Sequence, residues 1–330
     1  MPTPPIPSPA APSDVPPPSP PGGPAGAGSV AGVDIAGRLA DRDVLRALGA
    51  EPIVGLAAGR ALLMQLAHPK VARGVAEHSD FAERPLARLF GTLDFLLITS
   101  FGTPEEVARI AAKVRGVHNA VRGEGYSGND PDLQLWVNAT LIDSALYMHE
   151  RLGRPGRPDG ETAEEYYRQA RVVAEVLGCP LEEQPPDLAS FRAYMDETAA
   201  SLEVDDNARK VAAAVLHPAK LRALGPGLAV FRAVTTALLP EPIREQYGLP
   251  WDGRHRRTAA LVLGAAALGH RVTPGPLRRP PEALLVRLAR HRVERTLRER
   301  RARRRAARTG TGKADGGRRR QGERRQVTDE

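Results

Sequence analysis

From about residue 36 onward, apolar residues recur at three- and four-residue spacing, and runs of β-branched residues are scarce. This spacing is typical of amphipathic helices, whereas a half-buried strand alternates apolar and polar residues one by one. The pattern therefore predicts an all-α fold with no convincing strand. The predicted helices cover residues 52–66, 69–77, 85–97, 103–122, 130–152, 162–177, 187–202, 207–216, 228–239, 242–247, 253–268 and 281–307.

One helix start is marked more strongly than the others. Thr103 is followed by Pro104 and, three residues after the threonine, by Glu106. A threonine cap, a first-turn proline and an acid at the third helical position together form a capping box. We predict a helix from this threonine to Arg122, ending near Gly123.

Composition divides the chain into three parts. The first 30 residues contain 12 prolines, so residues 1–35 are expected to form a disordered, partly polyproline-like tail. Residues 36–285 are expected to form a single helical-bundle domain. Residues 286–330 are rich in arginine and are expected to form a basic helix that frays into a polar tail.

The net charge of +8 is concentrated at the C-terminal end. Residues 287–325 carry 17 basic and 4 acidic side chains, so the rest of the chain is mildly acidic. The basic segment could bind an anionic membrane surface or nucleic acid, or it could simply be a solvated end, which we favour. Because it lacks interleaved aromatic residues, we expect no sequence-specific nucleic-acid partner.

Several classes of protein are excluded by residue usage. Cys179 is the only cysteine, which rules out an internal disulfide and a cysteine-based zinc or iron–sulfur site. No secretory signal and no apolar run long enough to span a bilayer are visible, so we expect a cytoplasmic protein, peripheral to a membrane if the basic tail binds lipid. Nucleotide-binding loops and the HExxH zinc motif are also absent.

The most informative residues lie on the helix predicted over residues 103–122. Arg115, His118 and Arg122 stand at positions i, i+3 and i+7, which would place them on one helix face beside an apolar stripe. A neutral imidazole there could ligate haem iron, with the arginines paired to the propionates. From the spacing alone, a structural histidine is the better interpretation. Arg88 and Thr92, at i and i+4 on an apolar helix, would by themselves be a surface cation and a helical threonine.

A resemblance to a known family changes this balance. Over residues 62–152 the sequence resembles the family that unites the rubber oxygenases, or latex-clearing proteins, with the MpaB oxygenases. Four runs in the expected order carry the resemblance: QLAHPKVARGVAEHSDF, RPLARLFGTLDFLLITSFGT, VRGVHNAVRG and DPDLQLWVNATLIDSALYMHERLG.

The resemblance implies a helical bundle with haem b between helices. His118 matches the proximal iron ligand, within the Arg-x-x-His-x-x-x-Arg pattern that Arg115 and Arg122 complete. Arg88 and Thr92 match an Arg-x-x-x-Thr pair on the haem-pocket side, where they would act in catalysis.

Three departures from the family pattern concern the pocket. Gly91 stands where rubber oxygenases have a lysine that can cap the iron, so a lysine-closed resting state should be absent. Asn138 stands where many relatives have histidine. No secure counterpart exists for the acid proposed to aid proton transfer, and Glu77 and Asp80 are only nearby candidates.

The resemblance thus implies a haem-b-dependent oxygenase that uses O₂ to oxidise or cleave a carbon–carbon double bond in a small apolar, isoprenoid-like substrate. Two alternatives remain open. One is a haem sensor or carrier that does not oxygenate, and the other is a helical binding module that uses its basic tail.

Overall fold

The computed structural model describes residues 35–78, 85–153, 159–278 and 284–296, with residues 298 and 302. The prediction of an all-α fold is confirmed, because almost every regular element in these ranges is a helix. The exception is a two-stranded antiparallel hairpin, β1 (Arg122–Gly123) and β2 (Tyr126–Ser127). The Pro-rich tail, which is predicted to be disordered, lies almost wholly outside the described residues, as does most of the predicted Arg-rich helix and tail.

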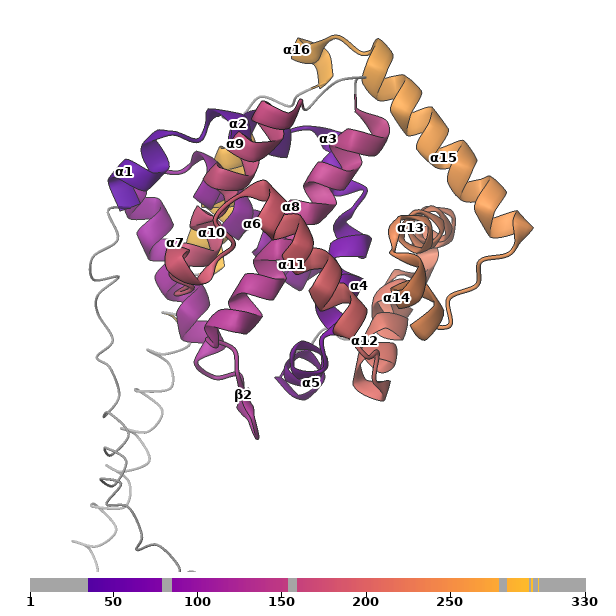
Figure 1. The fold of residues 1–330 in the computed structure, drawn as a ribbon, viewed down its shortest axis with the longest axis horizontal. Helices are drawn as coiled ribbons and strands as arrows, with labels where there is room; N and C mark the ends of the chain where they lie inside the picture. Colours follow the sequence, from indigo (N-terminus) through magenta and orange to yellow (C-terminus); the bar gives the residue numbers. More distant parts are fainter. Residues whose placement is uncertain are drawn as a thin grey trace, which may run out of the picture. The chain divides into compact units, whose positions relative to one another are not determined.

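The other regular elements of the described residues are helices (Figure 1). In the first half they are α1 (Ile35–Ala40), α2 (Asp43–Gly49), α3 (Pro52–Gly55), α4 (Ala58–Ala67), α5 (Pro69–His78), α6 (Pro85–Phe101), α7 (Pro104–His118) and α8 (Pro131–Leu152). In the second half they are α9 (Gly160–Ala170), α10 (Val172–Glu175), α11 (Leu188–Ser201), α12 (Asp206–Leu216), α13 (Gly225–Leu238), α14 (Glu241–Gln246), α15 (Gly253–Val272) and α16 (Gly275–Arg278), with 3₁₀ turns η1 (Leu181–Glu183) and η2 (Ala219–Leu224). A further helical segment covers residues 284–296.

The main core forms around α8, which runs through the middle of the helices and contacts α4, α9, α11 and α15 (Figure 1). Of its 22 residues, 13 are buried, among them the polar side chains of Gln134, Asn138, Thr140, Ser144 and His149. The largest fully buried side chains of the main core are Trp136, Tyr167, Phe191, Leu63, Met64, Leu66 and Ile243.

A second core joins α6 and α7 to α10. It contains Phe95, Ile98, Val107, Ile110, Ala111, Val172, Val173 and Val176. The helical segment 284–296 completes it on one side through Val286, Ala289 and Val293, which recur at three- and four-residue spacing and are all buried. The predicted domain boundary after residue 285 is not tested by this observation, but the residues just beyond it pack against α6 and α7.

Helix starts follow the sequence signals closely. The capping box at Thr103 is confirmed: its side chain accepts from the Glu106 amide, and the Glu106 carboxylate accepts from the Thr103 amide. The start of α9 was predicted at Thr162 and is wrong, because Asp159 caps the helix by accepting from the Thr162 amide at 2.8 Å. Asparagine and aspartate are better caps than threonine, and the acid lies three residues upstream.

The predicted end of the helix over residues 103–122 is also wrong. The helix α7 stops at His118, four residues early, and the chain turns into the hairpin. Gly125 has φ +76°, and a Cβ on Gly123 would lie 2.3 Å from the Tyr126 ring. Both glycines are therefore required by the turn, and the turn takes Arg122 off the helix.

No helix within the described ranges has both the length and the apolar character needed to cross a membrane.

Candidate functional site

The candidate site begins at the C-terminal end of α7, where His118 is the last helical residue. Val107, Ala111, Val114 and His118 recur every three or four residues and share one face of α7, here called the α7 inner face. Val107 and Ala111 are fully buried in the second core, whereas Val114 and His118 are only partly buried. Burial thus decreases along this face toward the histidine.

The matching face of α6 behaves in the same way. Thr92, Phe95 and Thr99 share the α6 inner face. Thr99 and Phe95 are 0% and 7% exposed, whereas Thr92 is exposed. Because α6 and α7 are joined by a tight connection at Gly102 and pack against each other, both inner faces are closed near that connection and open at the far ends.

Two arginines that lie outside α6 and α7 hold the end of these helices near their connection. The Arg42 guanidinium, which is buried, donates to the carbonyls of Leu39, Thr99 and Gly102. Arg46 donates to the Ser100 carbonyl at 2.8 Å. The final carbonyls of α6, which lack partners within the helix, are thereby satisfied. Burial lowers the pKa of Arg42 to about 10, so its charge is retained at neutral pH.

The imidazole of His118 is held by Gln134 of α8. The Gln134 Nε2 lies 2.9 Å from His118 Nδ1, and it also donates to the Gly128 carbonyl. Since a carbonyl only accepts, the contact with Gly128 identifies this atom as the amide nitrogen. Gln134 is 4% exposed, so its contacts stay out of water.

Close backbone packing brings this trio together. A Cβ on Gly128 would lie 2.9 Å from the His118 carbonyl oxygen and 3.2 Å from the His118 Cβ. Only glycine lets the loop after the hairpin approach the end of α7 so closely. Sequence reasoning missed Gln134 and Gly128. A glutamine among the apolar residues of α8 was the available signal, because a buried amide requires partners.

A polar cluster on α5 and the hairpin lies next to the site. The Tyr126 hydroxyl donates to Glu77 Oε2 at 2.6 Å, Arg73 pairs with Glu77 Oε1 at 2.9 Å, and His78 Nε2 lies 3.0 Å from the Arg122 carbonyl. The hydrogen bond from Tyr126, together with that from Arg73, lowers the pKa of Glu77. This carboxylate is ionised and anchors the hairpin to α5, while Asp80 lies outside the described residues.

The residues predicted to form the site are placed unequally. Arg115 and His118 lie on α7 and are partly buried, as a position beside an apolar stripe requires. The prediction that Arg122 shares their helix face is wrong, since it lies on β1 with its side chain exposed. Thr92 lies on the α6 inner face. Arg88 is on α6, but its side chain lies outside the described set. Asn138 is buried and lies 3.5 Å from the Ala170 carbonyl.

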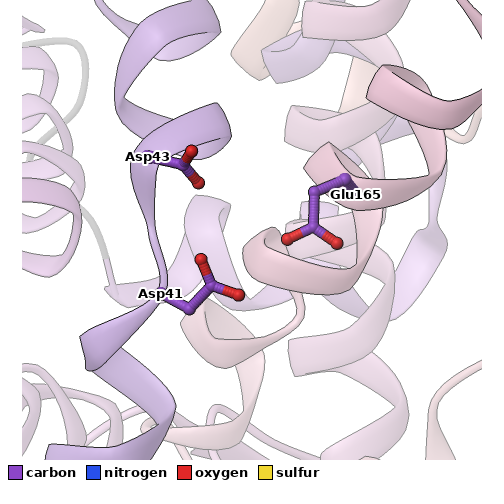
Figure 2. Close-up of side chains that lie close together, drawn as sticks. All are labelled: Asp41, Asp43 and Glu165. Carbon is purple, nitrogen blue, oxygen red and sulfur yellow. The ribbon is translucent and has the colours of Figure 1, made fainter.

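Three carboxylates elsewhere come close enough to suggest a cation site. Figure 2 shows Asp41, Asp43 and Glu165 facing one another between α2 and α9, and their oxygens lie within 4.8 Å of each other. The Gln169 amide donates to all three, and the Arg168 guanidinium pairs with Asp41 and Glu165. Arg168 supplies one positive charge and the neutral Gln169 amide supplies hydrogen bonds, and the cluster joins α2 to α9.

Comparison with known proteins places the whole region in a family. The profile of the family described as "ER-bound oxygenase mpaB/B'/Rubber oxygenase, catalytic domain" matches residues 45–271. Two uncharacterized proteins, from Mycobacterium bovis and Mycobacterium tuberculosis, are each 30% identical over 226 residues, covering 64% of this chain and 87% of theirs. No solved structure matches the chain. Because the match spans α2 to α15 and most of the described helices, the chain belongs to the family of MpaB and rubber oxygenase catalytic domains.

Proposed function

We propose that the protein is a haem-b-dependent oxygenase that uses O₂ to oxidise or cleave a carbon–carbon double bond in a small apolar, isoprenoid-like substrate. Membership of an oxygenase family supports the reaction class. The observation that carries the cofactor is the position of His118, at the open end of the α7 inner face, across from the open end of the α6 inner face.

His118 suits haem iron on one condition. An imidazole that binds iron through Nε2 must carry its proton on Nδ1 and donate it to an acceptor. Gln134 places its nitrogen against Nδ1, which favours the opposite tautomer. Turning the amide by half a rotation would present its oxygen instead, at the expense of the hydrogen bond to Gly128. The donor set fits haem once Gln134 turns, so haem binding should be coupled to this side chain.

The arginines would bind the propionates. Arg115 lies one turn before His118 on α7, and Arg122 projects from the hairpin directly after it. A guanidinium pairs well with a carboxylate, and a partly exposed position suits propionates that extend toward solvent. The two arginines would thus reach the propionates from a helix and a hairpin rather than from one helix face.

The α6 helix would form the substrate side. This end of α6 presents uncovered apolar surface at Leu93, which is 39% exposed, whereas Phe90, 42% exposed, lies on the side away from Thr92 with the Arg292 guanidinium over its ring. A flat apolar macrocycle and a hydrocarbon chain would both gain free energy by covering it. Arg88 and Thr92 would set the polarity of the pocket. The bound haem would supply the oxygen chemistry, which no side chain here provides.

A spectrum of the full-length protein reconstituted with haem tests the proposal. We expect a Soret band in the wild type that is lost or strongly shifted in His118→Ala. The matched control is His217→Ala, at an exposed histidine at the end of α12 and outside the proposed site, which should leave the band unchanged. A band identical in wild type and His118→Ala would contradict the ligand assignment.

The same sample distinguishes the alternatives. Consumption of O₂ with a polyunsaturated isoprenoid such as squalene supports the oxygenase. Reversible O₂ or CO binding without consumption would indicate a sensor or carrier. Absence of haem binding, with salt-dependent binding to nucleic acid, would indicate a binding module that uses the basic tail.

A further inference from the structure

The outer face of α15 is apolar and exposed along three turns. Leu261, Leu268 and Val272 are 75%, 63% and 67% exposed, and with Ala265 they share one face of the helix. Single exposed leucines are common on protein surfaces, but a continuous stripe of this kind indicates a surface that is covered in use.

The helix is firmly held from its other side. Ala259, Leu263 and His270 are buried, and α15 packs on α13 and α8 (Figure 1). The His270 ring lies 3.7 Å from the carboxylate of Glu51, which is also buried. Asp252 caps the first turn by accepting from the amides of Arg254 and His255. The stripe is therefore the fixed outward side of an anchored helix.

Charge selects among the partners that could cover this stripe. The 20 residues of α15 include no aspartate or glutamate, while Arg254, Arg257 and Arg271 are exposed at its two ends. A second copy seated on the same face in the antiparallel sense would bring these arginines together, and the nearby N-cap carboxylate, Asp252, already contacts His255 of its own helix. An anionic lipid surface instead offers phosphates to the arginines and acyl chains to the apolar stripe.

We propose that the outer face of α15 docks on the surface of an anionic lipid bilayer. The helix lies in the plane of the interface, with Leu261, Leu268 and Val272 below the headgroups and the arginines at phosphate level. This surface is separate from the candidate haem site and from the basic tail, and it does not depend on the oxygenase proposal.

Vesicle flotation of the full-length protein tests the surface. Vesicles of phosphatidylglycerol and phosphatidylcholine are compared with vesicles of phosphatidylcholine alone. We expect Leu261→Gln, Leu268→Gln and Val272→Gln, combined, to weaken binding to the anionic vesicles at least about tenfold. The matched control combines Leu224→Gln and Val230→Gln, two exposed apolar residues outside α15, and should bind like the wild type.

Salt separates this surface from the basic tail. Binding through the tail alone is electrostatic and should disappear between about 0.15 M and about 0.5 M salt. Binding through α15 should persist in part at the higher salt concentration in the wild type, and the triple variant should lose this salt-resistant binding. Equal binding of the wild type and the triple variant at both salt concentrations would overturn the proposal.

A fluorescence probe adds a direct readout. In Leu268→Trp, emission above the background of the two native tryptophans should shift to the blue on anionic vesicles and be quenched by brominated acyl chains. An unquenched, unshifted probe would overturn the proposal. A second outcome would also overturn the proposal: the wild type is a dimer in solution, the triple variant is a monomer, and neither binds vesicles. That outcome would assign the face to a second copy.

Discussion

The main core and the second core differ in how completely they are closed. The main core around α8 is surrounded by helices, and its largest side chains are almost fully buried. The second core is closed only near the α6–α7 connection, and burial decreases toward Thr92 and His118. The closed core therefore fixes the fold, whereas the open one leaves surface that a bound group can cover.

Buried charge follows the same division. In the main core, Arg60 is 5% exposed and donates to the Leu238 carbonyl and the Ser144 hydroxyl while pairing with Asp143 at 2.6 Å. In the second core, Asp94 is 6% exposed and pairs with Arg292 of the segment 284–296. The first charge is satisfied from α8 and α13, but the second depends on a segment more than 190 residues away in sequence.

The largest expected effect is on stability, when leucine is truncated to alanine in each of the two cores. Leu63→Ala, at a fully buried position in the main core, should lower the free energy of unfolding by about 2–5 kcal/mol. Leu97→Ala, at a partly buried position against the second core, should cost about 1–2 kcal/mol, because less area leaves the interior. Urea unfolding measures both, and equal losses would contradict the difference in closure.

The contribution of segment 284–296 is tested by Ala289→Glu. A carboxylate at this fully buried position should detach the segment and lower the free energy of unfolding by about 2–4 kcal/mol. The loss cannot exceed what the segment contributes, which is mainly the burial of its valines. Leu288→Glu, at an exposed position on the same helix, should stay within about 0.5 kcal/mol of the wild type. Hydrogen exchange should show faster exchange on α6 and α7 only in the first variant.

Haem affinity tests whether the open core is the cofactor side. Gln134→Leu removes the polar partner of His118 and should weaken haem binding about 10–100-fold, equivalent to about 1.4–2.7 kcal/mol. Gln134→Glu supplies an acceptor for Nδ1–H without any rotation and should bind haem at least as tightly as the wild type. Soret titrations measure both affinities. If Gln134→Leu bound as tightly as the wild type while folding normally, the coupling of haem to this side chain would be refuted.

The smallest effect concerns the ion pair between Glu106 and Arg290, which joins α7 to the segment. Glu106→Gln keeps the capping box but removes the charge and should cost about 0.5–1 kcal/mol at neutral pH, since the pair is partly exposed. The hydrogen bond from Arg290 lowers the pKa of Glu106 below its usual 4.5. The stability is thus present above that pH and is lost as the pH falls through the lowered pKa.

Thermal unfolding at several pH values measures this difference. The difference in melting temperature between wild type and Glu106→Gln should disappear in acid. Glu197→Gln, which removes an exposed acid of α11, should melt like the wild type at each pH. A gap that persists at low pH would show that packing, rather than charge, joins the two elements.

Sequence patterns predicted the helices well where a local signal sufficed. Thr103 with Pro104, and Asp130 with Pro131, mark helix starts that the structure reproduces. The end of α7 depends instead on Tyr126 packing over Gly123, a contact between residues on two strands that periodicity cannot detect. The helix predicted over residues 52–66 is broken at Leu56 and Ala57, directly after Gly55, the last residue of α3.

The candidate site shows the same limit. The place of His118 on α7 follows from sequence, but its contact with Gln134 joins two helices across a hairpin. Which imidazole nitrogen of His118 faces Gln134 could not be predicted from sequence, because it depends on how closely Gly128 approaches the end of α7. Sequence thus predicted where the candidate ligand His118 lies, and tertiary packing determines which side chain contacts its Nδ1.

Segment 284–296 also bears on how the protein can be shortened. The family match ends at residue 271, and that boundary suggests the matched part alone as a unit to express. Removing everything beyond it would strip Ala289 and Val293 from the second core and leave Asp94 without Arg292. A chain cut at the family boundary should therefore aggregate, and a useful truncation should end after residue 296 instead.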